Sequence, residues 1–468
     1  MVHWLIVLLL ALATPALGAT RIALHLTQEE LNILKNRAVN GPYRVAGDVS
    51  PNSPGDWTRI LNNANTFRDA GSPKPQRWNG YTGTGCMTEA APGPGLEAGT
   101  MLRDAAFAYL VTGRTAYRDA VRTELIAQTG LAGVQFTNTT KFSRASGCLP
   151  GAAGQKIQQI NAWVQHLTIG YDYVRSTFTS GQRAAIDAWF LGAARFLNAY
   201  PVFSAEQRWP NRNSNNYTTP TPPANSPCAN DIRYSTANPY AEAPCRREWQ
   251  DAWNNLLLSH SRTAGTIGVM LGNTALITSA KRHMREWLMF MIYPDGSSGE
   301  LDRWTTDNPN RGMGYWGGTL GHYIAFADAL CRARDCELYN YSTSHGYYGT
   351  AGGPKTLLAS ITEYLQMREH TIVRYAAKGA SAQTAERIMD GIHTGHHDIG
   401  DVWITPANHF YRSSFMKGHY LRTSSDPQVL DYPANPAGGQ LWWGGNQMIW
   451  PGILLQFGNL EGRVRPYE

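Results

Sequence analysis

The sequence contains no block of lysine and arginine residues, and it has no apolar run long enough to cross a bilayer. The missing basic block excludes the usual footprint of a nucleic-acid binder, although the net charge is +6. The apolar run from Trp4 to Ala13, followed by Pro15 and small residues, predicts a cleaved secretion signal over residues 1–18. We therefore expect a secreted monomer, extracellular or periplasmic, with no membrane partner.

Cysteine is also scarce, with six among 468 residues. In an exported protein such cysteines suggest disulfides. Six cysteines allow fifteen pairings, of which proximity in the sequence favours Cys331–Cys336, Cys228–Cys245 and, by remainder, Cys86–Cys148.

Long alternating strand patterns are absent as well, whereas helical spacing recurs throughout. Capping boxes at Thr27–Glu30 and Thr179–Gln182 predict helix starts, and Gly113 separates two helical stretches. Further helices are expected at 248–272, 275–292, 316–331, 354–368 and 382–390. Helix pairs joined by loops favour an all-α fold, an (α/α) toroid or incomplete α/α barrel of six or seven helix pairs. We expect one catalytic domain over 19–468, with 390–468 as a loop-rich closing segment.

Two stretches interrupt the helical pattern and are expected to form loops at one rim of the toroid. Residues 208–245 are rich in proline, asparagine, serine and threonine, and residues 293–318 are rich in glycine. Long irregular loops in a compact domain usually carry function. Fifteen tryptophans and 23 tyrosines, many in loops, would suit sugar stacking.

These loops and the helix between them carry residue types that suit elimination next to a uronate. That reaction needs a group that neutralises the carboxylate, a base for the C5 proton and an acid for the C4 oxygen. Asparagine, glutamine, arginine or histidine can do the first, and tyrosine or histidine the others. The chain supplies them in the order Asn215, Asn216, Asn254, Asn255, His260, Arg303, Arg311 and Tyr315.

The segment Asp295-Gly-Ser-Ser-Gly-Glu-Leu-Asp-Arg303, followed by Arg311-Gly-Met-Gly-Tyr315, resembles the corresponding segment of alginate lyases with α/α-toroid folds. Upstream, Ile169-Gly-Tyr-Asp-Tyr173 and the asparagine-rich loop stand in the order those enzymes show, so the resemblance covers roughly residues 95 to 335. It implies a polysaccharide lyase that cleaves an anionic polysaccharide, either alginate or polymannuronate, or glucuronan. The chemistry requires no cofactor and no metal ion.

Carried over by residue, the resemblance implies that Tyr315 transfers the proton and that Arg303 or Arg311 steadies the tyrosine or the carboxylate. Asn215 or Asn216 would neutralise the uronate, and His260 would be the histidine of the site. If the C5 proton and C4 oxygen lie on opposite faces of the sugar, His260 becomes the base. Substrate contacts are expected from Asn216, Tyr217, Asn255, Trp316 and His322.

The chain departs from one branch of that family, which has a contiguous Asn-Asn-His, because here Asn216 is followed by Tyr217. It is more similar to the alginate and glucuronan lyases that separate the asparagine from a histidine on the next helix. On an ideal helix Asn255 and His260 lie about 140° apart. This separation favours the loop asparagines over Asn255 as partners of His260.

Three other interpretations remain open. A toroidal glycoside hydrolase would use two carboxylates, for which Asp295, Glu300, Asp302 and Asp307 are candidates. A zinc site at His393, His396, His397 and Asp398 matches no standard spacing. A non-catalytic carbohydrate-binding protein would explain the aromatic residues, but not the ordered asparagines, histidine, arginines and tyrosine.

Overall fold

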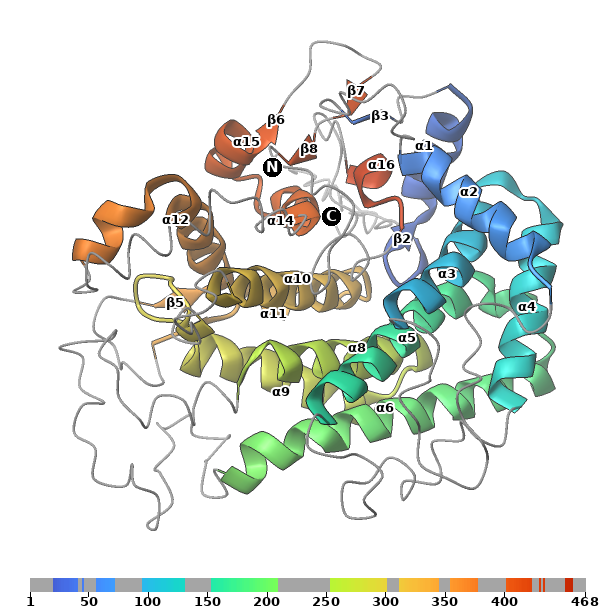
Figure 1. Ribbon diagram of the computed structural model, residues 1–468, viewed down its shortest axis with the longest axis horizontal. Coiled ribbons are helices and arrows are strands. Elements are labelled where there is room, and N and C mark those ends of the chain that lie inside the picture. Colours follow the sequence, from blue (N-terminus) through green and yellow to red (C-terminus); the bar gives the residue numbers. More distant parts are fainter. Residues whose placement is uncertain are drawn as a thin grey trace, which may run out of the picture.

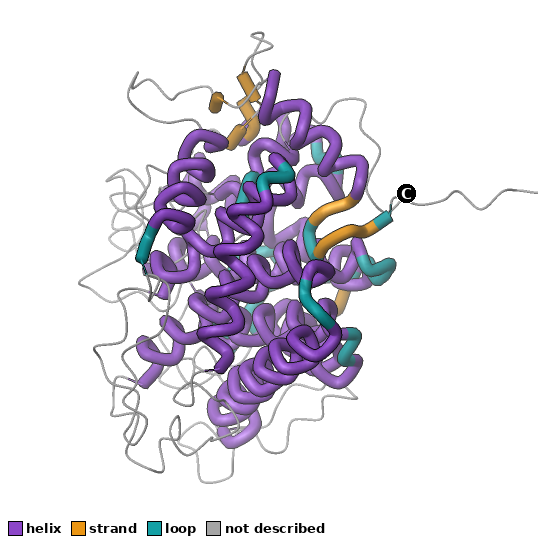
Figure 2. Tube along the Cα trace, turned by 90° about the vertical axis from the view of Figure 1, so that its right-hand side faces the viewer, coloured by secondary structure: helices purple, strands orange, loops and turns teal. Residues whose placement is uncertain are grey.

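A computed structural model describes the chain over residues 20–40, 44–45, 56–71, 95–130, 153–208, 253–300, 311–344, 354–377, 401–422, 429–430, 432–433 and 451–457. Helices dominate this part of the chain (Figure 2). In it, no helix is both long enough and apolar enough to cross a membrane. The all-α prediction is therefore confirmed.

Seven helices form a closed circuit in which each contacts the next and the last returns to the first. In circuit order they are α3 (Gly95–Thr112), α5 (Ala153–Val174), α8 (Asn255–Leu271), α10 (Arg311–Arg332), α14 (Ile404–Tyr411), α16 (Ile453–Phe457) and α1 (Gln28–Asn40). Figure 1 shows the chain passing around the molecule in sequence order, from the blue N-terminal helices to the red C-terminal ones. The described helices thus form an (α/α) toroid, as predicted.

A second layer covers this circuit from outside. It consists of α2 (Asp56–Asp69), α4 (Thr115–Gly130), α6 (Ser180–Arg208) and α9 (Thr274–Phe290). Within the layer α2 contacts α4, α4 contacts α6 and α6 contacts α9, and each also contacts a helix of the inner circuit. Between α8 and α9 the chain reverses at Gly272, which adopts φ +69° and caps α8 in the left-handed region that favours glycine.

Four helices of the inner circuit, α3, α5, α8 and α10, run in the same direction. Along α5 and α8, Asn161 bonds to Ser259, and one turn further on in both helices Gln165 faces Arg262. The same advance occurs between α8 and α10, where Arg262 meets His322 and Gly265 lies against Phe326. On the other side, Gly99 and Gly170 let α3 and α5 approach closely. Because the helices are parallel, their N-terminal ends share one rim.

Local signals in the sequence are confirmed where the structure describes them. The Thr27 backbone N–H donates to Glu30 at 2.8 Å and the Glu30 N–H returns to Thr27 at 3.3 Å, which completes the first capping box. Thr179 and Gln182 repeat it at 3.2 and 3.3 Å before α6. Gly113, with φ +73°, separates α3 from α4.

One prediction about a loop is wrong in part. Residues 293–318 were expected to be irregular throughout, but α10 begins at Arg311 and Tyr315 lies within this helix. Two glycines of α10, Gly317 in this stretch and Gly321 just after it, are places of close packing. A Cβ on Gly317 would lie 2.5 Å from the Tyr364 hydroxyl, and one on Gly321 would lie 3.2 Å from Trp403. Burial of the helix therefore outweighs the low helix propensity of glycine.

The N-terminal segment closes the rim at the opposite ends of these helices. The Leu24 N–H donates to Asp172 at the end of α5 at 2.6 Å, and His25 bonds to Asp328 on α10 at 2.9 Å. Arg332 completes the cluster through ion pairs with Glu30 and Asp328. Apart from the half-buried Asp172, these groups are buried. They fasten α1 to the far rim.

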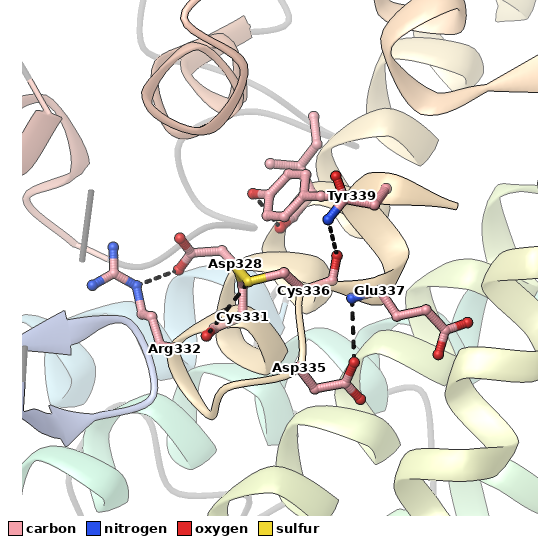
Figure 3. Close-up of a disulfide and its surroundings, with 9 residues drawn as sticks. Asp328, Cys331, Arg332, Asp335, Cys336, Glu337 and Tyr339 are labelled. Atoms are coloured by element: carbon pink, nitrogen blue, oxygen red, sulfur yellow. Dashed lines mark hydrogen bonds and ion pairs between the residues drawn. A yellow bond between two sulfur atoms is a disulfide. The ribbon is translucent and has the colours of Figure 1, made fainter. Parts of the chain in front are cut away.

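The end of α10 also carries the described disulfide, Cys331–Cys336, which confirms one predicted pairing (Figure 3). Beside it, the Glu337 N–H donates to the Asp335 carboxylate at 3.2 Å and starts the short helix α11 (Glu337–Asn340). The other four cysteines lie outside the described residues.

Two further helices and four two-stranded ladders complete the described α-helices and strands. The helices are α12 (Leu357–Ala377) and α15 (Ser414–Tyr420). Four two-stranded ladders pair β1 (Arg21–Ala23) with β2 (Leu26–Thr27), β3 (Arg44–Val45) with β7 (Val429–Leu430), β4 (Ser342–Thr343) with β5 (Lys355–Thr356), and β6 (Leu421–Arg422) with β8 (Tyr432–Pro433). Only β3 and β7 are parallel. The β3–β7 ladder joins distant parts of the chain, whereas the other three pair segments that are close in the sequence.

Candidate functional site

The parallel inner helices carry a band of buried polar side chains, which we call the polar belt. Its members are Arg103 on α3, Asn161, Gln165 and His166 on α5, Ser259 and Arg262 on α8, and His322 on α10. All are at most 3 % exposed. Polar groups in such a position cost free energy unless they are hydrogen-bonded or meet a ligand. The belt is therefore the natural place to search for function.

On α3, Arg103 is the conventionally paired arginine of the belt. Its guanidinium donates to the Asp104 carboxylate at 2.9 and 3.1 Å and to His166 Nδ1 at 3.2 Å. Asn63 also donates to Asp104, at 2.7 Å. Because arginine has no acceptor atom, His166 Nδ1 must accept, so the neutral ring carries its proton on Nε2.

The second arginine, Arg262, has a different set of partners. The Gln165 amide, with its oxygen turned toward the guanidinium, accepts from Nε, Nη1 and Nη2 at 2.7, 2.8 and 3.1 Å. His322 Nδ1 accepts from Nη1 at 3.4 Å. No carboxylate among the described residues pairs with Arg262. Burial, and then the nearby Arg103, lower the pKa of Arg262 to about 9, so it remains a cation at neutral pH.

Histidines in and beside the belt are neutral. Burial, followed by the charges of Arg103 and Arg262, holds the pKa of His166 well below 6.5. Burial and the charge of Arg262 do the same for the pKa of His322. The pKa of His260, on α8 close to His322, falls to about 3 because the ring is buried. These rings are donors and acceptors at neutral pH, but weak bases.

Tyr315 stands on α10 at the rim where the inner helices begin. It precedes His322 by seven residues, which on an ideal helix places the two on nearly the same face and about 10 Å apart along the axis. Its backbone carbonyl accepts from the Thr319 hydroxyl at 2.6 Å. Tyr315 is half-buried, unlike the buried belt, so its ring lies nearest to solvent among the described candidates.

Asn254 and Asn255 occupy the same level of the neighbouring helix α8. Asn254 caps the helix, accepting from the Leu256 and Leu257 N–H groups at 3.0 and 3.2 Å. The Asn255 N–H donates to the Glu300 carboxylate at 2.7 Å. Asn255 precedes Arg262 by seven residues, just as Tyr315 precedes His322. Asn255, the first residue of α8, and Tyr315, in the second turn of α10, therefore lie at matching levels of adjacent helices.

Trp316, which was predicted to contact the substrate, is more deeply buried than that role suggests. It is fully buried, donates its indole N–H to Ser360 Oγ at 3.2 Å and packs edge-on against Tyr364. This is a core packing position. Contact between Trp316 and a substrate stays a prediction.

Several predicted site residues lie outside the described part of the chain. They are Asn215, Asn216, Tyr217 and Arg303; Arg311 is described only as the first residue of α10. Asn215, Asn216 and Tyr217 precede α8 in the sequence, and Arg303 precedes α10. Both helices start at the rim of Asn255 and Tyr315.

The carboxylates named for a hydrolase have local structural partners where they are described. Asp295 accepts from the Ser297 N–H and hydroxyl at 2.9 and 2.6 Å, within the turn that follows α9. Glu300 is fully buried against the start of α8. Asp302, Asp307 and the cluster His393, His396, His397 and Asp398 lie outside the described residues. Within the described ranges no group of three or more metal-binding side chains occurs.

Sequence reasoning missed most of the polar belt. Asn161 and Gln165 interrupt the apolar spacing of α5, and Arg262 interrupts that of α8, which is the one signal available before the helices are placed. The partners of these residues come from other helices. Only packing brings them together.

Comparisons with known proteins are limited to fold likeness. No family model matches the chain and no curated protein matches it. Solved structures that resemble it include alginate lyase A1-III from Sphingomonas species A1, with 12 % identity and a TM-score of 0.48, and an alginate lyase from Bacteroides ovatus, with 14 % identity and a TM-score of 0.49. Each comparison covers 88 % of this chain, and 95 % and 97 % of the respective structures. At this level of likeness, function has to be argued from the residues themselves.

Proposed function

We propose that the protein is a secreted polysaccharide lyase that cleaves a polyuronate, either alginate or polymannuronate, or glucuronan, by β-elimination. The observation that carries this proposal is the arrangement along α8 and α10. Tyr315, half-buried, lies two turns from the contact between Arg262 and His322, where a buried cation has no carboxylate partner among the described residues. A tyrosine that can transfer protons, two helical turns from the buried cation Arg262, suits an anionic sugar polymer as substrate.

The reaction breaks the C5–H bond, uses its electron pair to form the C4–C5 double bond, and expels the C4 oxygen, which takes up a proton. Tyr315 is assigned both proton transfers when the two groups lie on one face of the sugar. The phenolate takes the C5 proton and the phenol returns it to the C4 oxygen, so the side chain ends as it began. His260 is the weaker candidate base because burial lowers its pKa to about 3.

Neutralising the uronate carboxylate is assigned to residues at the same rim. Asn215 and Asn216 keep this proposed role, with Arg303 or Arg311 as the cation and Tyr217 as a substrate contact. Asn255 joins them because it starts α8 at the level where Tyr315 lies on α10. His260 and His322, which are buried on α8 and α10, are proposed to hold the side chains behind these groups in place.

The deciding experiment offers the purified protein a panel of polymannuronate, polyguluronate and glucuronan. An unsaturated C4–C5 uronate absorbs in the ultraviolet, so the expected result is a rise in absorbance with at least one polymer. Products are then analysed for an unsaturated non-reducing end. Saturated products carrying solvent oxygen would instead indicate the carboxylate-pair hydrolase, and binding without any product would indicate a carbohydrate-binding protein.

A further inference from the structure

Glu300 lies against the first residue of α8, with 0 % of its surface exposed. Its side-chain atom Oε1 accepts from the backbone N–H of Asn255 at 2.7 Å. Asn254 caps the same helix by accepting from the next two N–H groups, those of Leu256 and Leu257. The first three backbone donors of α8 are therefore all bonded to side chains. The first of the three is bonded to a carboxylate, which the positive end of the helix dipole favours.

The turn that carries Glu300 is itself held in place. The Gly299 N–H donates to the Met291 carbonyl at 2.7 Å, which closes the turn at the end of α9. Gly296, with φ +92°, lies so close to α12 that a Cβ there would be 2.6 Å from the Ala359 carbonyl oxygen. Because the turn is fixed against both α9 and α12, Glu300 presents its carboxylate to α8 from a firm base.

A second carboxylate fastens the chain just before α8. The Trp253 indole N–H donates to Glu286 on α9 at 3.2 Å, and the Trp253 ring packs against Phe290 with 4.7 Å between the ring centroids. Glu286 thus holds the chain that leads into the helix. Glu300 is different because it binds the backbone of Asn255 itself.

The geometry separates two possible roles of Glu300. A general acid or base has to come within hydrogen-bond distance of the atom whose proton it moves. Glu300 is fully buried, and its Oε1 is engaged by a backbone N–H. That N–H belongs to Asn255, one of the groups assigned to the uronate carboxylate. An effect of Glu300 on the reaction would therefore pass through Asn255.

We propose that Glu300 is a positioning residue, which fixes the backbone of Asn255 and so holds the Asn255 side chain in place for the substrate carboxylate. The part that Asn255 plays in the reaction rests on the proposed function, whereas the tie between Glu300 and α8 does not. The same tie fixes the point from which the chain continues to Arg303, three residues later.

The test compares Glu300→Gln and Glu300→Leu in the purified protein. Glutamine keeps an oxygen that accepts from Asn255 but lacks the charge, and leucine has neither. Hydrogen exchange followed by mass spectrometry reports on the peptide that begins α8. Its first turn should exchange about 10- to 100-fold faster in Glu300→Leu, the range expected when a hydrogen bond to a charged group is lost, and by a smaller factor in Glu300→Gln. Glu124→Gln changes a buried glutamate of the outer helix α4 and is the matched control, with wild-type exchange at α8.

Turnover of a polyuronate that the wild type cleaves separates positioning from proton transfer. A displaced Asn255 should lower kcat by about 10²-fold in Glu300→Leu and by less in Glu300→Gln. The pH profile of kcat should keep its shape in Glu300→Gln, because the proposed role moves no proton. A catalytic acid or base would instead lose as much activity in Glu300→Gln as in Glu300→Leu, together with one limb of the profile. Glu124→Gln should keep the wild-type kcat.

Unchanged exchange at the start of α8 in the folded variants overturns the proposal, and so does loss of a limb of the pH profile in Glu300→Gln. If Glu300→Leu does not fold, Glu300→Gln decides through the same two measurements. Wild-type turnover and exchange in the variants would reject the positioning role and keep the lyase. Faster exchange in the variants of a protein that cleaves no polyuronate would reject the lyase and keep the tie between Glu300 and α8.

Discussion

Arg332, at the end of α10, and Glu30, in the first turn of α1, form a buried ion pair although 302 positions of chain separate them. The Asp328 carboxylate accepts from the same guanidinium at 2.8 Å and from Nδ1 of the His25 ring at 2.9 Å. This network holds the N-terminal segment against the far rim of the toroid. Removal of this network should therefore lower the free energy of unfolding of the protein.

The first prediction concerns this network. Arg332→Met leaves two buried carboxylates without their cation, so we expect the free energy of unfolding to fall by about 3–5 kcal/mol. Urea unfolding followed by circular dichroism measures it. Arg68→Met, which removes the exposed pair with Asp69, should leave the free energy of unfolding nearly unchanged. A similar loss in both variants would contradict the structural role of Arg332.

Arg262 provides a contrast with Arg332 in the same measurement. Arg262→Met leaves no carboxylate of the described residues without its cation, and it removes a buried charge whose partners are neutral. Its loss of stability should therefore be clearly smaller than that of Arg332→Met. If Arg262→Met is the more damaging of the two, an acidic side chain of this chain neutralises Arg262.

Stability should also depend on pH through the buried histidines. Burial lowers the pKa of His25 to about 4 and that of His260 to about 3, and it also lowers the pKa values of His166 and His322. In the unfolded chain these groups titrate near 6.5. As pH falls below 6.5 the unfolded state binds protons that the folded state does not, so stability is fully present above 6.5 and is lost toward pH 4.

Each such proton changes the unfolding free energy by about 1.4 kcal/mol per pH unit. Asp172 acts in the opposite direction, because burial raises its pKa to about 6 and the folded state takes up that proton first. Urea titrations at pH 7.5, 6.5 and 5.5 should show a falling midpoint. His25→Gln should reduce the slope by about one proton. An unfolding free energy that stays level from pH 7.5 to 5.5 would count against neutral buried histidines.

Local features of this fold were accessible from the sequence, whereas the site was only partly so. The capping boxes at Thr27 and Thr179 and the break at Gly113 depend on residues within four positions of one another. The belt depends on contacts such as Arg103 with His166 and Arg262 with His322, which span 63 and 60 positions. No local pattern encodes such pairs. They arise only when the inner helices lie parallel.

At the start of α10, by contrast, a local sequence signal gave a wrong prediction. Gly312, Gly314, Gly317 and Gly318 around Tyr315 predict a loop by intrinsic propensity, and tertiary packing overrides it. Asn255 and His260 nevertheless lie on α8 and Tyr315 lies on α10, and these two helices contact each other.

Disulfide pairing in the two undescribed pairs stays a prediction. Cys228–Cys245 would close a loop of the size for which a crosslink removes roughly 3 kcal/mol of unfolded-state entropy. Peptide mapping of the non-reduced protein should recover Cys228–Cys245 and Cys86–Cys148 together with Cys331–Cys336. A free thiol at Cys228 or Cys245 would end the idea that a crosslink holds the asparagine-rich stretch.

Close packing between α8 and its neighbours predicts a difference between two glycine substitutions. A Cβ on Gly265 would lie 2.5 Å from both Ala280 and Phe326, so Gly265→Ala should destabilise by about 1–3 kcal/mol. Gly181, at the start of α6, has no atom within 4 Å of an added Cβ. Gly181→Ala should therefore be neutral or stabilise by up to about 1 kcal/mol. Thermal unfolding of both variants measures this, and equal effects would contradict the packing described.

The last prediction tests the residue that carries the proposed chemistry. Tyr315→Phe keeps the ring and its packing but removes the only transferable proton of the side chain, so turnover of the polyuronate should fall by about 10²–10⁴. Folding should persist, because it does not depend on the hydroxyl. Tyr109→Phe, on α3 beside Arg118, is the matched control and should keep its rate within a few fold. If Tyr315→Phe retains most of its activity, the tyrosine only packs, and the proton transfers must pass to His260 despite the low pKa of that ring.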